Sequence, residues 1–231
     1  MVGHEWGAGA VGYWALRFGG APGIVALTFG AMAGTCLFAF ACAWKQKADG
    51  RILALAGILV APLFSVAFPP VRAEAYALVF FSSLLFAIEL HRQGARWALP
   101  VWCPVFVIWV NCHASFVLAF LFLGVYWLSA RWVRRRNIHI LVWIACLAGL
   151  IAINPYGLAM YPYLWRTVRM ARPAVEEWAP VWHGGFAPFL RPILISLGLV
   201  LYALWRQRAE LLSRSASIQP AATILLTAAA G

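Results

Sequence analysis

Charged residues are scarce in this 231-residue chain, and acidic residues are the scarcest of them. Only 11% of the residues are charged, and 7 Asp and Glu stand against 18 Lys and Arg. Hydrophobic residues make up 64% of the sequence, and the mean hydropathy is +0.82. A soluble domain has about 25% charged and about 45–50% apolar residues. The composition therefore excludes a water-soluble globule and predicts an all-α, polytopic membrane protein.

Three further features narrow the chemistry. The five cysteines lie in or at the ends of apolar runs without Cys-x-x-Cys spacing, which argues against a disulfide framework and a zinc site. No glycine-rich nucleotide-binding loop is present. The net charge of +11 would indicate a nucleic-acid partner in a soluble domain. In a membrane protein such charge belongs to cytoplasmic loops. We expect membrane lipids as partners, no nucleic acid and no resident cofactor.

Apolar runs separated by charged residues predict the membrane spans. We expect about seven or eight transmembrane helices in a single transmembrane domain over residues 1–231. The predicted spans are 22–44, 52–68, 74–90, 98–112, 114–130, 138–153 and 190–205, with an eighth that begins near 218. A short polar break around Asn111 and His113 separates the fourth span from the fifth, and it predicts a tight helical hairpin.

The loop charges predict the orientation of these spans. With the N-terminus outside, the inner loops contain two thirds of the 18 basic residues, and the short outer loops are close to neutral. Short loops rich in Lys and Arg lie in the cytoplasm. We therefore expect residues 131–136 and 206–214 inside and the loop 154–189 outside. This places the chain in the inner (cytoplasmic) membrane.

The two ends of the sequence do not fit a complete protein. Residues 1–21 contain neither a signal peptide nor a convincing first span, although the charges place them outside. The sequence stops at Gly231, part-way through an apolar run. We expect a fragment of a longer membrane domain.

Most polar residues that a lipid environment does not explain map to the outer side. Ionisable groups near membrane depth are costly unless paired or hydrated, so their clustering indicates a functional site. Five segments contribute such residues: His4 and Glu5; Arg72 and Glu74; Asn111 and His113; Asn154, Tyr156 and Gly157; and Glu176, Glu177 and Trp178. Each segment also has a structural interpretation, namely a solvated tail, a loop ion pair, helix caps, a turn or a solvated acidic pair.

Residues 155–172 form a different kind of element. Apolar side chains recur there at helical spacing with arginines between them: Leu158, Tyr161, Leu164, Trp165 and Val168, with Arg166, Arg169 and Arg172. This pattern predicts an interfacial amphipathic helix on the outer leaflet. A plain connector is the alternative. An arginine fork suits phosphate oxygens, so these arginines are candidates for lipid-phosphate binding.

The order of the polar motifs resembles a known family. The motifs are His4-Glu5-Trp6, Arg72 at the start of a span, the segment Trp109 to Phe116, Asn154-Pro155-Tyr156-Gly157, and Glu177-Trp178. This order resembles bacterial membrane proteins described as GT-C-type glycosyltransferase-like and related to the dolichyl-phosphate-mannose protein mannosyltransferases. The resemblance covers about residues 4–182.

Two departures from the family pattern are present. Cys112 and Ala114-Ser115 stand where the family has Leu and Gly-Gly around the histidine. The family's acidic first outer loop, with its presumed catalytic Asp, precedes the His-Glu-Trp motif and has no counterpart in this sequence.

The resemblance implies transfer of a sugar from a polyprenyl-phosphate-linked donor at the outer membrane face. Such transfer needs a carboxylate to activate the acceptor and donor groups to hold the departing phosphate. Glu5 and Glu177 are then the available catalytic carboxylates. The substrate-binding candidates are His4, Arg72, Asn111, His113, Asn154, Tyr156, Arg166, Arg169 and Trp178. A divalent metal on His4 and Glu5 is weakly supported, since two neighbouring ligands do not make a site.

Two other classes of protein stay open at this stage. A non-catalytic membrane subunit or pseudoenzyme fragment would fit the missing N-terminal loop. A transporter fits less well, because the sequence shows no internal repeat and few ionisable residues at the centres of its spans.

Overall fold

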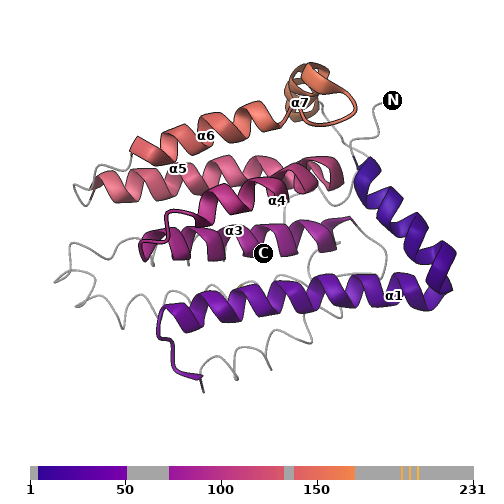
Figure 1. Cartoon of the computed structure of the whole chain (residues 1–231), viewed down its shortest axis with the longest axis horizontal. Helices are drawn as coiled ribbons and strands as arrows, with labels where there is room; N and C mark the ends of the chain where they lie inside the picture. The colour runs from indigo at the N-terminus through magenta and orange to yellow at the C-terminus, as the bar shows by residue number, and fades with distance from the viewer. Residues whose placement is uncertain are drawn as a thin grey trace. The chain divides into compact units, whose positions relative to one another are not determined.

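The structure is a computed structural model of the chain, and it describes residues 5–50, 73–132 and 138–169 with the single positions 194, 198 and 202. Every regular element in these ranges is a helix (Figure 1). Two helices, Trp6–Lys45 and Ala75–Arg92, are long and apolar enough to cross a membrane by length and composition. The all-α class is thus confirmed for the described residues, and the count of seven or eight spans stays a prediction. The predicted spans 52–68 and that near 218 lie outside the described residues, and within 190–205 only the helical positions 194, 198 and 202 are described.

The chain divides into two compact units, and each is described by itself. The first comprises Met1–Leu123 and Val142–Met160, and the second comprises Gly124–Leu141 and Tyr161–Gly231. The helices are α1 (Trp6–Lys45), α3 (Glu74–Arg92), α4 (Ala98–Cys112), α5 (Val117–Trp132), α6 (Ile138–Leu150) and α7 (Met160–Arg169), with the short 3-10 helices η1 (Ala114–Phe116) and η2 (Gly157–Ala159).

A sharp bend divides α1 into two arms. Gly20 has φ 60° and ψ −155°, a conformation that residues other than glycine rarely adopt. Pro22 follows, and its missing N–H removes a helical hydrogen bond. The arms 6–19 and 21–45 therefore meet at an angle (Figure 1). The second arm matches the predicted span 22–44. The first arm is helical in a region where the sequence indicated neither a signal peptide nor a convincing membrane span.

The buried face of α1 carries small residues, while its large apolar residues face outward. Thr28, Ala31 and Thr35 are buried at helical spacing. Phe29 and Leu37 are 65% and 68% exposed. Small residues let membrane helices approach closely, and lipid takes the place of water around the large ones. This distribution is typical of a helix in a bilayer.

Aromatic side chains fill the core between α3, α4 and η1. Trp109, Phe106 and Phe116 are fully buried, and the indole Nε1 of Trp102 donates to Ser83 Oγ at 2.9 Å. The ring of Phe106 lies 5.9 Å from that of Phe116 and 5.8 Å from that of Phe120. Because Phe106, which precedes His113, contacts two rings that follow it, α4 and α5 form the predicted helical hairpin. His113 itself is extended, with φ −162° and ψ 140°.

Helix α7 lies within the segment that the sequence predicts to be an amphipathic helix. The amphipathic pattern over 155–172 is helical over 160–169, after the turn η2. The guanidinium carbon of Arg169 lies 4.0 Å from the centre of the Trp165 ring, which is a cation–π contact. The predicted helix is present, and its place on a membrane surface stays a prediction.

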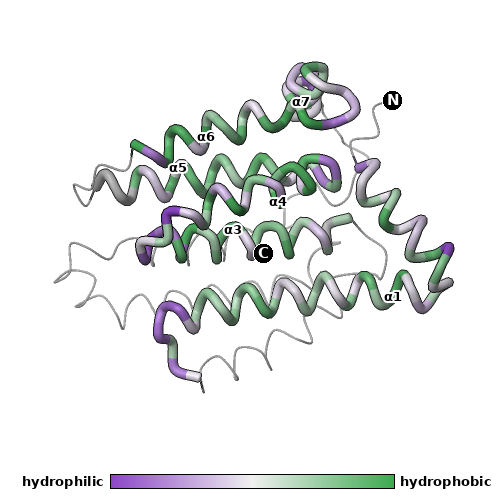
Figure 2. The backbone as a smooth tube through the Cα atoms, in the orientation of Figure 1, coloured by the Kyte–Doolittle hydropathy of each residue, from purple (hydrophilic) through white to green (hydrophobic). Residues whose placement is uncertain are grey.

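A buried carboxylate that the sequence analysis did not single out joins the ends of α1 and α3. Glu89 is only 4% exposed, and it accepts hydrogen bonds from Arg92 Nε at 2.8 Å, Gln93 Nε2 at 2.7 Å and Gln46 Nε2 at 3.4 Å. Gln93 also donates to the carbonyl oxygen of Lys45 at 2.8 Å. Hydrophilic residues gather at these helix ends (Figure 2). The network therefore fixes the end of α1 against the end of α3.

Removal of this carboxylate is expected to destabilise the protein. Glu89→Ala removes the acceptor that serves Arg92, Gln93 and Gln46, and hydrogen bonds to charged groups contribute about 1.5–3 kcal/mol each at most. Because Arg92 remains partly solvated, we expect the free energy of unfolding to fall by about 1–3 kcal/mol. Thermal unfolding of the purified protein in detergent measures it. The control is Arg96→Ala in the exposed loop that follows, and equal melting temperatures for the two variants would contradict this role for Glu89.

Candidate functional site

Two polar segments that the sequence analysis placed on the outer side meet in the first unit. The indole Nε1 of Trp6, at the start of α1, donates to Asn111 Oδ1 at the end of α4, at 2.7 Å. These residues are 105 positions apart in the chain. The backbone approach is equally close, since a Cβ built on Gly7 would lie 2.7 Å from the carbonyl oxygen of Asn111. Glycine at position 7 therefore permits the contact.

Asn111 also binds a third segment. Its Nδ2 donates to the carbonyl oxygen of Val107 at 2.7 Å, within α4, and to that of Ile153 at 2.9 Å, after α6. An amide group has two N–H donors and one carbonyl acceptor. Both donors and the acceptor are thus engaged, and Asn111 joins three segments of the chain. Its contacts favour a positioning role over the direct substrate contact that the resemblance implies.

The hydrogen bonds of His113 assign its tautomer. The backbone N–H of Ser115 donates to His113 Nδ1 at 3.1 Å, and Ser115 Oγ lies 2.7 Å from the same nitrogen. Since this backbone N–H makes Nδ1 an acceptor, the Ser115 hydroxyl donates to it, and Ser115 Oγ in turn accepts from the indole Nε1 of Trp109 at 3.0 Å. Because Nδ1 accepts both bonds, the neutral ring carries its proton on Nε2.

The Nε2–H of His113 faces a carboxylate. Glu5 Oε1 lies 3.5 Å from His113 Nε2, and both side chains are partly exposed. Glu5 precedes the first turn of α1, whose position is fixed through Trp6 and Asn111. The carboxylate therefore lies next to the imidazole, and the turn at Ser115 orients the imidazole. A carboxylate in this position can accept a proton from a bound hydroxyl group.

Asn154 shapes the turn that supplies Ile153. Its Oδ1 accepts from the backbone N–H of Tyr156 at 2.7 Å, and its Nδ2 donates to the carbonyl oxygens of Ile151 and Gly157. This is an Asx-turn. Of the two interpretations left open by the sequence, the contacts of Asn154 favour the structural turn. α6 ends at Leu150, three residues before the predicted end of the span.

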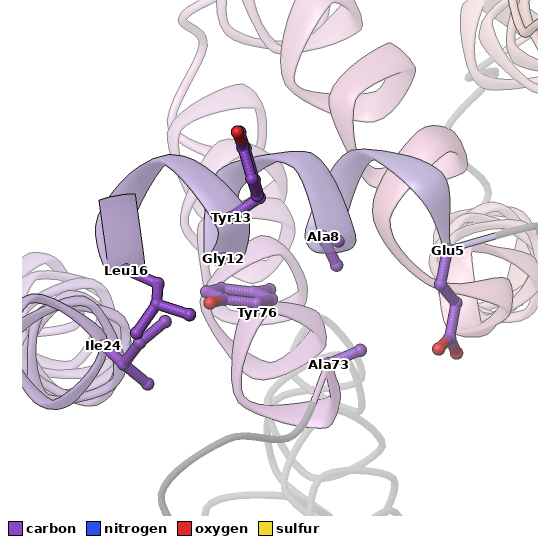
Figure 3. A pocket seen from close by; sticks show the side chains of 9 residues that line it. Glu5, Ala8, Gly12, Tyr13, Leu16, Ile24, Ala73 and Tyr76 are labelled. Atoms are coloured by element: carbon purple, nitrogen blue, oxygen red, sulfur yellow. The ribbon is translucent and has the colours of Figure 1, made fainter. Parts of the chain in front are cut away.

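A cleft opens beside Glu5. Its volume is about 550 Å³, and it lies along the first arm of α1 opposite the start of α3 (Figure 3). The lining residues are Glu5, Ala8, Gly9, Gly12, Tyr13, Leu16, Ile24, Ala73 and Tyr76. The carboxylate of Glu5 stands at one end of this mostly apolar cleft (Figure 3). The cleft was not predicted, because its residues carry no motif and come from segments far apart in the chain.

The remaining predicted site residues lie in the second unit or outside the described residues. Arg166 and Arg169 lie on α7 in the second unit. His4, Arg72, Glu177 and Trp178 lie outside the described residues. In residues 5–50, 73–132 and 138–169, no three His, Cys, Asp or Glu side chains converge on a position for a metal ion. The suggested metal pair includes His4, so it stays untested.

Three residues that the sequence analysis did not assign to the site hold it together through hydrogen bonds: Trp6, Trp109 and Ser115. Trp6 belongs to the His-Glu-Trp motif, and its position next to Glu5 could have indicated its part in the site. Ser115 was treated as a departure from the family's Gly-Gly, although its hydroxyl and N–H now fix His113.

No family model, curated protein or solved structure matches this chain. The chemistry of the site therefore follows from its own geometry.

The hydrogen bond between Trp6 and Asn111 should make a measurable contribution to the stability of the protein. Trp6→Phe keeps most of the apolar surface and removes the N–H donor, so we expect the free energy of unfolding to fall by about 0.5–1.5 kcal/mol. In the Asn111→Ala background the same substitution should cost clearly less, because the acceptor is already gone. Thermal unfolding in detergent gives both values. Trp14→Phe, on the same arm, is the control, and additive effects of the Trp6 and Asn111 substitutions would refute a direct bond.

Proposed function

We propose that this chain is a multi-pass protein of the inner (cytoplasmic) membrane with GT-C-type glycosyltransferase activity. It transfers a hexose from a polyprenyl-phosphate-linked donor at the outer face of the membrane. The order of the polar motifs supports this proposal, and so does the excess of basic residues in the short inner loops. The outward-facing large apolar residues of α1 support the membrane location.

The observation that carries the proposal is the pair of Glu5 and His113 at the end of a cleft. Sugar transfer requires that an acceptor hydroxyl lose its proton as its oxygen attacks the anomeric carbon. Glu5 is placed to take that proton, and His113 Nε2 lies 3.5 Å from the carboxylate. The bond from the anomeric carbon to the phosphate oxygen breaks in the same step, and the polyprenyl phosphate leaves with its electron pair.

The departing phosphate requires positive charge. Arg72, Arg166 and Arg169 are the candidates, because guanidinium groups bind phosphate oxygens through two parallel hydrogen bonds. In the second unit, Arg169 stacks on the exposed ring of Trp165. An arginine held against an interfacial tryptophan is suited to the phosphate depth of a bilayer.

Substitution of Glu5 tests the catalytic part of the proposal. The assay uses the full chain in membrane vesicles with a panel of tritiated hexoses linked to polyprenyl phosphate, and it measures label that leaves the donor. A general base contributes about 10²–10⁴-fold to a rate, so Glu5→Gln should lower transfer about a hundredfold or more. Asp49→Asn, a carboxylate at the other end of α1, is the matched control and should transfer at the unsubstituted rate.

Two results of this assay contradict the proposal. Equal transfer by Glu5→Gln and the unsubstituted chain would remove Glu5 from the reaction. Absence of transfer from every hexose donor, with the lipid-linked donors still bound, would identify a non-catalytic membrane subunit instead.

A further inference from the structure

The cleft beside Glu5 has a carboxylate at one end and a mostly apolar lining, to which Tyr13 and Tyr76 add their hydroxyl groups. Glu5, Ala8, Gly12 and Leu16 follow one another at helical spacing along one face of the first arm of α1. Glu5 marks one end, whereas Leu16 and Ile24, which lies beyond the bend, close the other (Figure 3). At a rise of about 1.5 Å per residue the face from Glu5 to Leu16 is about 16 Å long. The cleft is thus an elongated space with a carboxylate at one end.

Two glycines provide the room in the cleft. A Cβ built on Gly9 or on Gly12 would meet no atom within 4 Å. This contrasts with Gly7, where a Cβ would collide with the backbone of Asn111. A glycine inside a helix costs about 1 kcal/mol relative to alanine. Close packing explains why position 7 is a glycine, but it does not explain the glycines at positions 9 and 12. The absence of side chains at Gly9 and Gly12 leaves open space beside the helix.

The charge of the lining selects the kind of ligand. Glu5 is the acidic lining residue, and none of the nine described lining residues is Lys, Arg or His. A phosphate group near Glu5 would meet its carboxylate without a compensating cation from the described lining, since Arg17 lies outside the lining and donates to the Tyr13 hydroxyl at 2.8 Å. A hydroxyl or ammonium group can instead donate to the carboxylate, because an ionised carboxylate is a hydrogen-bond acceptor with two oxygens. The rest of the lining suits a hydrocarbon chain.

We infer that the cleft binds a single-chain amphiphile with a hydroxyl or ammonium head, and that an amphiphile with a hydroxyl head is the acceptor. The head donates to Glu5, and the chain lies over Gly9 and Gly12 and ends against Leu16 and Ile24. The assignment of this amphiphile as the acceptor rests on the proposed function, whereas its binding in the cleft does not. The phosphate of the sugar donor then binds elsewhere.

Photolabelling tests the ligand class directly. Dodecanol, dodecylamine and dodecyl phosphate, each with a diazirine on the chain, are added to the purified full-length protein in nanodiscs, and the labelled peptides are mapped by mass spectrometry. We expect the alcohol and the amine to label residues 8–24 or 73–76, and the phosphate to label them at least tenfold less. Equal or stronger labelling by dodecyl phosphate would overturn the inference.

Two substitutions make the test specific for the cleft. Gly12→Leu fills the space without a clash, so labelling by all probes at residues 8–24 should fall at least tenfold while the melting temperature is kept. Gly30→Leu, at an equally open position of α1 away from the cleft, should label as the unsubstituted chain does. Glu5→Gln should lower labelling by the amine about tenfold or more. Unchanged labelling in a folded Gly12→Leu variant would reject the cleft as the binding site.

The outcome is separable from that of the transfer assay. Labelling requires no sugar donor and no reaction. Specific labelling without any transfer would contradict the proposed activity and leave the amphiphile site standing. Transfer that is unaffected by Gly12→Leu would contradict the acceptor assignment and leave the activity standing.

Discussion

The amide group of Asn111 is the interaction on which the rest of the site depends. It accepts from Trp6 and donates to the carbonyl oxygens of Val107 and Ile153, so it joins the first turn of α1, the end of α4 and the turn after α6. Glu5 precedes Trp6, and His113 follows Asn111 two residues later. Holding the two segments together therefore brings the carboxylate to the imidazole.

The bend in α1 allows the first arm of the helix to lie over the start of α3. A straight helix from Trp6 to Lys45 would extend about 60 Å, twice the thickness of the hydrocarbon core. The positive φ of Gly20 and the missing N–H of Pro22 instead turn the first arm away from the second. The arm can then close over the start of α3, with Tyr76 and Ala73 below it (Figure 3). The cleft is the space left between these elements, because Gly9 and Gly12 do not fill it.

Local patterns in the sequence predict the helices well and the site only in part. The apolar run 98–112 is helical over the same residues, since its ends are marked by polar neighbours. The helix 6–19 was not predicted because four glycines and Arg17 interrupt its apolar pattern. The turn at Asn154 follows from its own chemistry, whereas the partner of Asn111 lies 105 residues away, and no local pattern contains that pairing. The pairing of Glu89 with Gln46 was overlooked for the same reason, since the two residues are 43 positions apart, whereas Arg92 lies only three residues from Glu89 on α3.

The central claim, that the start of α1 docks on the turn between α4 and α5, is open to direct measurement. Cysteines are placed at positions 5 and 113 in a full-length variant without native cysteines, and membranes are treated with a short bis-maleimide crosslinker. The account predicts an intramolecular crosslink in high yield. The control pair, at positions 5 and 96, spans the length of α4, about 22 Å, and should not crosslink. Equal yields for the two pairs, or no crosslink between positions 5 and 113, would contradict the account.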